Sequence, residues 1–184
     1  AAINGGVVHV AEMGNNPCPS TDYESYLRKS SLSRTSRVPV TLYAMMGPDT
    51  SPLSGENVPY KLCHARTTGK SDLIFFPSCA AIRKAAKRYV GRHVSQHCEY
   101  MKILKLHEGE TLHELKRPPE AEESSIDYAL HLIEYVFGQG KLCHCSVMSG
   151  IEKIVKAKRR GVQVTCEITP HHLFFDTSMI TDEN

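Results

Sequence analysis

Three residues in separate apolar segments carry side chains suited to metal-dependent hydrolysis. Lys61 lies inside one such segment, His97 closes a second, and His144 closes a third. Imidazole nitrogens bind zinc readily. Burying a lysine ammonium among apolar residues is costly unless the amine is paired or modified. The pattern therefore indicates either a metal centre that uses the lysine, or a lysine at a strand edge whose head reaches water.

A fourth segment, "VTCEITPHHLFF" (Val164–Phe175), adds an acid and two imidazoles. Its first part, Val164–Ile168, predicts a buried strand that carries Glu167 and leads into His171 and His172. In parallel α/β folds, sites lie at the carboxyl ends of strands. Polar side chains at several strand ends would then converge on one face of the molecule.

Taken singly, each of these residues has a structural interpretation. A histidine near a strand end is usually hydrogen-bonded or exposed, so neither His97 nor His144 identifies a site alone. We expect Glu99 and Asp22 to be surface or helix-capping acids. Structural or surface roles are also expected for His9, His64, His93, His107, His113 and His131.

The elements that would position these residues alternate between strand-like and helix-like segments. Six short apolar runs predict strands buried on both faces; they are residues 7–13, 38–46, 58–64, 93–99, 141–146 and 162–169. Capping residues, helical spacing and terminal glycines predict helices between most of them; these cover residues 21–34, 78–91, 118–138 and 149–161. Alternation of this kind indicates an α/β fold with parallel strands.

Composition limits the classes of function. The 184 residues are 41% hydrophobic and 23% charged, which is ordinary for a globular domain, and the net charge of +2 gives no sign of nucleic-acid or membrane binding. No apolar run approaches the ~20 residues of a membrane span. The odd number of cysteines favours buried, reduced thiols in a cytoplasmic enzyme; they are Cys18, Cys63, Cys79, Cys98, Cys143, Cys145 and Cys166.

Six motifs occur in an order that resembles a known family. They are "GGVVHVAEMGNNPCPST", "VPYKLCHA", "VSQHCE", "RPPEAE", "KLCHCS" and "GVQVTCEITPHHLFF". Together they resemble the dihydroorotases, which belong to the cyclic amidohydrolases, and the last motif is the most specific. The resemblance implies part of a (β/α)₈ TIM-type barrel of the metal-dependent hydrolase kind, with about six βα units. It also implies a centre of one or two metal ions, usually zinc.

The resemblance further implies roles for individual residues. Lys61 matches a carboxylated lysine that bridges the metal ions, and His97 and His144 match the next two ligands. Asn15 matches an asparagine that holds the substrate's carboxylate. Residues expected to orient these ligands or to bind a further metal are Cys143, Glu167, His171 and His172.

The chain departs from the family pattern in three ways. Gly14 replaces the usual proline, and Tyr100 replaces the usual aspartate after "HCE". The first-strand His-x-His pair and the late aspartate that acts as general base do not occur. We therefore expect residues 1–184 to be an incomplete hydrolase barrel that lacks its first and last strands. No catalytic base lies in it, and that aspartate is expected beyond residue 184.

The implied reaction is the reversible hydrolysis of the cyclic amide of dihydroorotate to carbamoyl aspartate in pyrimidine biosynthesis. Two alternatives remain: a non-catalytic scaffold with the same barrel, and a sibling enzyme such as an allantoinase. The expected partner is a small-molecule substrate, without nucleic acid or membrane. A homo-oligomer or a larger pyrimidine-pathway assembly and a cytoplasmic location are also expected.

Overall fold

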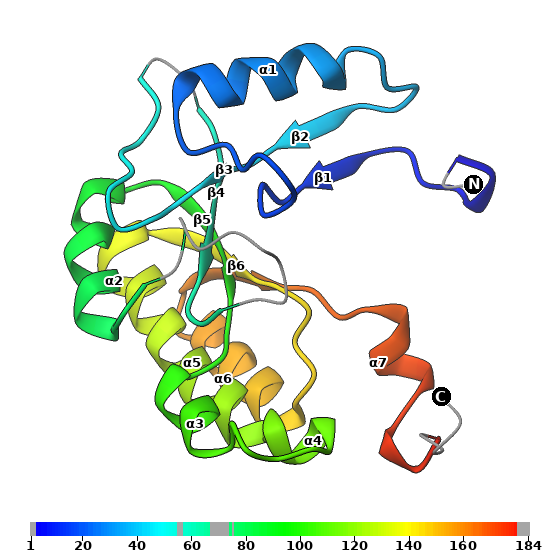
Figure 1. Ribbon diagram of the computed structural model, residues 1–184, viewed down its shortest axis with the longest axis vertical. Helices are drawn as coiled ribbons and strands as arrows, with labels where there is room; N and C mark the ends of the chain where they lie inside the picture. The colour runs from blue at the N-terminus through cyan, green and yellow to red at the C-terminus, as the bar shows by residue number, and fades with distance from the viewer. Residues whose placement is uncertain (1–2, 55–56, 67–73, 75, 180–184) are drawn as a thin grey trace.

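Parallel strands in two sheets organise the computed structural model, which describes residues 3–54, 57–66, 74 and 76–179 (Figure 1). The larger sheet has the order β3-β4-β5-β6-β7, so each strand pairs with the next one in the chain. The strands are β1 (Val10–Glu12), β2 (Val40–Leu42), β3 (Ala44–Met45), β4 (Tyr60–Cys63), β5 (His93–His97), β6 (Gln139–Leu142) and β7 (Gln163–Cys166). Every pairing is parallel.

Helices connect most of the successive strands. Figure 1 shows α1 along the β1–β2 pair, and α2, α5 and α6 beside the five-stranded sheet, while α7 lies away from it. The helices are α1 (Tyr23–Ser33), α2 (Cys79–Ala86), α3 (Met101–Leu106), α4 (His113–Lys116), α5 (Pro119–Leu132), α6 (Met148–Arg159) and α7 (Pro170–Phe174). Shorter turns are η1 (Ile3–Gly5), η3 (Lys87–Tyr89), the π-helical η4 (Ile133–Phe137) and η5 (Thr177–Met179). None of the helices in these described ranges has the length and apolar character needed to cross a membrane.

Local sequence signals account for the ends of the longer helices. The Asp22 side chain accepts a hydrogen bond from the Ser25 backbone N–H, forming a capping box at the start of α1 and confirming its expected capping role. Ser78 caps α2 in the same way through Ala81. Gly161, with φ of +92°, follows the C-terminal end of α6 in a left-handed conformation that suits glycine.

The structure corrects several expected boundaries. Residues 38–46 form two strands, β2 and β3, that belong to different sheets. The helices α3, α4 and α7 were not predicted, because four to six residues are too few to show helical periodicity. The predicted strand at Val164–Ile168 is confirmed as far as Cys166, but the prediction that it is buried was wrong beyond Val164. In the described sheet β7 has a neighbour on one side only, so Val164 is buried but Ile168 is half exposed.

The core lies between the sheet and the helices beside it. It includes Tyr60 and Leu62 from β4, Ile126 from α5, and Phe137 and Leu142 near β6, all fully buried. The seven cysteines are free thiols, but only four are buried. The expectation of buried thiols was therefore wrong for Cys18 and Cys166, which are exposed.

Gly140 permits close packing between β5 and β6. A Cβ atom at this position would lie 2.7 Å from the carbonyl oxygen of Val94 and 2.8 Å from Cγ1 of Ile133. The first contact is with backbone of the paired strand, which cannot move away without breaking the ladder. The sheet therefore requires glycine here.

We expect Gly140→Ala to lower the free energy of unfolding by about 1–3 kcal/mol, because the added methyl group overpacks the strand interface. Gly109→Ala is the matched control, since a Cβ there would meet nothing within 4 Å. Urea denaturation of both variants measures the difference. Equal stability of the two variants would contradict the packing described for β5 and β6.

His64 is a buried histidine held between two polar side chains. Its Nε2 donates to Oε1 of Gln96 at 2.8 Å, and its Nδ1 accepts from Oγ of Ser125 at 2.8 Å. Burial lowers the pKa of His64 from 6.5 to about 4, and the nearby His97 and Lys61 charges act in the same direction. The folded protein therefore keeps this ring neutral at pH values where the unfolded chain protonates it.

Stability should fall as the pH drops from about 6.5 towards 4, because only the unfolded state takes up a proton on His64 in that window. A difference of roughly 2.5 pKa units corresponds to about 3 kcal/mol across the window. Denaturation at several pH values, compared between the native sequence and His64→Gln, isolates this contribution. If the variant shows the same slope of stability with pH, His64 does not titrate as described.

Candidate metal centre

Two histidines meet at the carboxyl edge of the larger sheet. His97 is the last residue of β5, and His144 lies two residues after β6. Nδ1 of His97 is 3.0 Å from Nε2 of His144, and the ring centroids are 4.8 Å apart. The structure thus brings together two of the residues singled out in the sequence.

His144 has an unusual backbone conformation. Its φ is +36°, which is uncommon for a residue other than glycine. Such conformations cluster at functional sites, where the surrounding structure holds them in place. Burial lowers the pKa of His144, with smaller contributions from the His97 and Lys61 charges, so its ring is held neutral. A neutral imidazole is the form that binds a metal.

Glu99 fixes the orientation of His97. Its Oε2 accepts a hydrogen bond from Nε2 of His97 at 2.7 Å and another from the Arg117 guanidinium. Burial alone would raise the pKa of Glu99, but the hydrogen bonds and charges of His97 and Arg117 outweigh it and lower the pKa. The ionised carboxylate is only an acceptor, so Nε2 of His97 carries the proton and Nδ1 presents a lone pair toward His144.

The expectation that Glu99 is a surface or capping acid was therefore wrong. Its side chain is 13% exposed and contacts a candidate ligand. The glutamate in "HCE", two residues after His97, was a visible signal. Arg117 is 18 residues away in sequence and carried no local signal for this contact.

Lys61 is buried in β4, on the strand next to β5. Its side chain does not reach water: the residue is 4% exposed, and Nζ donates to Sγ of Cys143 at 2.9 Å. Burial raises the pKa of Cys143, although the Lys61 charge opposes that rise, so the contact is not a strong ion pair. The burial of Lys61 excludes the interpretation of this residue as a strand-edge lysine whose ammonium reaches water.

The remaining predicted residues have other contacts. The Glu167 carboxylate accepts from the Lys141 ammonium, and Nδ1 of His172 is 3.1 Å from the carbonyl oxygen of Cys145. His171 is exposed. Asn15 is exposed as well, and the structure does not bring its side chain to the histidine pair.

The distance between the two imidazole nitrogens fits two ligands of a tetrahedral metal ion. With Zn–N distances of ~2.0–2.1 Å, adjacent ligand nitrogens in a tetrahedron lie ~3.3 Å apart, close to the 3.0 Å between His97 and His144. Within the described ranges, however, no group of three or more His, Cys, Asp and Glu side chains could hold a metal. Further ligands are required, and a carboxylated Lys61 would supply one.

A hollow of about 280 Å³ opens beside the histidine pair. Residues of β5, α4, α5 and the segments after β6 and β7 line it, among them His97, Glu99, Arg117, His144 and His172. It is large enough for a small ring, and most of the residues that line it are polar. The two imidazoles therefore lie at the carboxyl edge of a parallel sheet, beside a space that a small molecule can enter.

Comparisons with known proteins find relatives over most of the chain. No protein-family model matches it. It is 33% identical over 114 residues to a dihydroorotase of Streptomyces coelicolor, covering 57% of this chain and 27% of that protein. It is 28% identical over 193 residues to a dihydroorotase of Methanosarcina acetivorans, covering 95% of this chain and 41% of that protein.

Solved structures agree on the fold. An L-hydantoinase (dihydropyrimidinase) from Arthrobacter aurescens superposes with a TM-score of 0.82 at 22% identity, over 95% of this chain and 42% of that one. A D-hydantoinase from Bacillus sp. AR9 gives 0.74 at 20% identity.

The chain is similar in sequence to dihydroorotases and in fold to hydantoinases.

Its parallel sheet with intervening helices corresponds to a portion of the barrel of these enzymes, which confirms the predicted fold class. The chain spans less than half the length of these relatives, 41% for the Methanosarcina acetivorans protein and 42% for the Arthrobacter aurescens one. The histidine pair lies at the carboxyl edge of this sheet, which is the edge where the sites of barrel enzymes lie.

We expect Glu99→Gln to weaken metal binding by about 10–100-fold, because the amide cannot hold His97 as an ionised carboxylate does. Competition between the protein and a coloured chelator for zinc measures this directly, without an activity assay. Glu120→Gln, in the exposed first turn of α5, is the control and should leave zinc affinity unchanged. Unchanged zinc affinity in Glu99→Gln would show that this carboxylate does not support the centre.

Proposed function

We propose that the chain is part of a dihydroorotase, a zinc-dependent enzyme that opens the cyclic amide of dihydroorotate to give carbamoyl aspartate. The observation that carries the proposal is the meeting of His97 and His144 at 3.0 Å on adjacent strand ends, with Lys61 buried on the neighbouring strand β4. Dihydroorotases are also among the curated relatives, with 33% identity over 57% of the chain in one case and 28% over 95% in another, against about 20% for the hydantoinase structures. Residues 1–184 would then form one incomplete hydrolase barrel.

The proposed metal site uses one or two zinc ions held by His97, His144 and a carboxylated Lys61. Carboxylation converts the lysine from a cation into an anionic oxygen ligand, which also removes the cost of a buried ammonium without a carboxylate partner. When bound, zinc supplies Lewis-acid activation of water and of the substrate carbonyl. The residues of this chain then have three tasks: to hold the metal, to orient its ligands and to position the ring.

Orientation comes from Glu99 and Arg117. The Arg117 guanidinium holds the Glu99 carboxylate, which holds the Nε2 proton of His97 and leaves Nδ1 free to bind. Because this network is largely buried, the imidazole does not reorient when substrate enters. Asn15 would donate its amide to the carboxylate of dihydroorotate, as the family resemblance implies. The proton from the attacking water requires an acceptor, and we assign that role to no described residue.

This activity belongs to pyrimidine biosynthesis, and we propose a cytoplasmic location. The hydantoinases supply a second candidate, since their structures share the fold at a TM-score of 0.82. Dihydroorotate carries a ring carboxylate, and the neutral rings dihydrouracil and hydantoin do not. Assays of the full-length protein on all three rings separate the candidates. Dihydroorotate should be hydrolysed fastest, and a preference for hydantoin or dihydrouracil would overturn the dihydroorotase assignment.

Lys61→Ala in the full-length protein should remove most bound zinc and most activity, because it deletes the proposed bridging oxygens. A short carboxylic acid added to this variant should restore part of both by occupying the space of the lost side chain. Lys84→Ala, an exposed lysine on α2, is the control and should match the native protein. Metal content by elemental analysis, together with turnover, provides the readout. Native zinc content and turnover in Lys61→Ala would refute the role of Lys61.

A further inference from the structure

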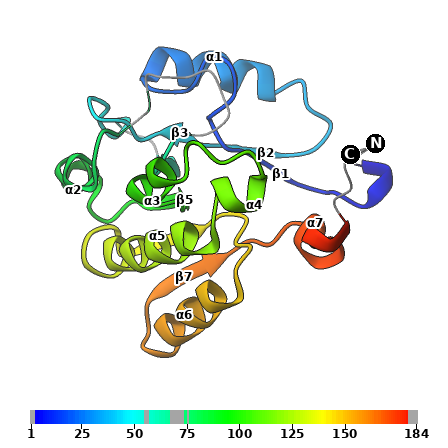
Figure 2. The same cartoon turned by 60° about the horizontal axis from the view of Figure 1, so that its bottom comes forward.

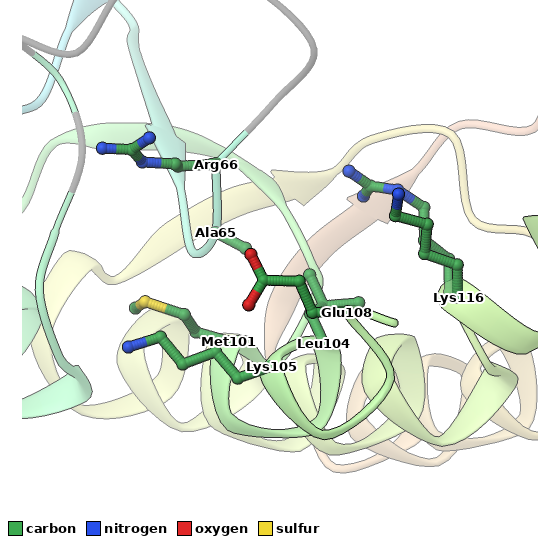
Figure 3. Close-up of a pocket in the computed structure, with 8 residues that line it drawn as sticks. Ala65, Arg66, Met101, Leu104, Lys105, Glu108 and Lys116 are labelled. Carbon is green, nitrogen blue, oxygen red and sulfur yellow. The ribbon is translucent and has the colours of Figure 1, made fainter. Parts of the chain in front are cut away.

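The described structure has a further hollow besides the one at the histidine pair. It has a volume of about 380 Å³ and is bounded by the end of β4, by α3 and by α4 (Figure 3). Arg117 lines both this pocket and the hollow beside His97. The pocket is therefore separate from the proposed metal centre but shares one wall residue with it.

The pocket concentrates positive charge. Its charged lining residues are Arg66, Lys105, Lys116 and Arg117 together with the carboxylate of Glu108, and the charge of Arg117 is balanced by its ion pair with Glu99. Figure 3 shows Arg66 and Lys116 on opposite sides, with the Glu108 carboxylate pointing into the space between them. Like charges gathered around one hollow repel each other and raise the local concentration of anions. A bound anion would relieve that repulsion.

Several donors of the pocket remain available. Within the described part of the chain, the ammonium groups of Lys105 and Lys116 make no hydrogen bond or ion pair. Arg117 uses one terminal nitrogen for Glu99, so its other N–H groups can bind a ligand without releasing that contact. The pocket therefore offers several donors to an anion.

Apolar side chains line the pocket between these donors. Ala65 is buried, and Met101 and Leu104 of α3 are half-buried. Contacts with such surfaces reduce the water around an ion pair and strengthen it relative to a pair on an open surface. A concave pocket with an apolar lining and convergent charges is the usual form of a small-molecule site.

We propose that this pocket binds a small molecule with two or more anionic oxygens, a dicarboxylate or a phosphate. The Arg117–Glu99 contact links its occupancy to the orientation of His97. Binding needs no metal, so it stands apart from the proposed dihydroorotase activity.

The test measures binding of inorganic phosphate and of succinate to zinc-depleted full-length protein by isothermal titration calorimetry. The double variant Lys105→Ala/Lys116→Ala should bind about tenfold more weakly, because two of the four cationic groups are lost. The control is Lys84→Ala/Lys102→Ala, which removes the same charge from exposed positions on α2 and α3 outside the pocket. This control should bind as the native protein does.

Each result decides the proposal. Saturable binding of phosphate alone or of succinate alone supports the site and identifies its ligand class, and binding of both supports a general dianion site. Phosphate or succinate should also shift the imidazole NMR signal of His97 through Arg117 and Glu99. Lack of saturable binding, or equal weakening in the two double variants, would overturn the proposal, because the attraction would then be a property of net charge alone.

Discussion

The parallel register of β4, β5 and β6 is the constraint on which the candidate centre depends. Cys63 pairs with His97, and Gln96 pairs with Leu142, so these strands end at nearly the same level. A shift of one residue in either pairing would turn alternate side chains to the opposite face and separate the histidine rings. Backbone hydrogen bonds between the strands set this register. They fix where the proposed functional side chains lie, although those side chains take no part in them.

The same edge of the sheet concentrates groups that reduce stability in a purely structural protein. A lysine amine is buried against a thiol, a non-glycine residue adopts a left-handed conformation, and two imidazoles are in contact. Each arrangement carries a cost that apolar packing elsewhere must offset. For the two imidazoles, the proposed metal site would explain this cost, because ligands that are already held together lose less freedom on binding.

Arg117 connects two parts of the molecule that would otherwise be independent. Through Glu99 it reaches His97, and through its remaining donors it faces the basic pocket between β4, α3 and α4. Arg117 directly follows α4, so the position of this short helix sets where the guanidinium lies. The insertion of α3 and α4 between β5 and α5 provides that placement.

The sequence by itself determined the alternation of strands and helices and the parallel class of the fold, and it singled out His97 and His144, which meet, and Lys61, which is buried. Those features depend on periodicity, capping and residue type, which are local properties. Tertiary structure decided which side chains meet. It brought Glu99 into contact with His97 and Arg117 and buried Lys61 against Cys143. It also left one flank of β7 exposed. These depend on register and sheet position, and no short stretch of sequence encodes either one.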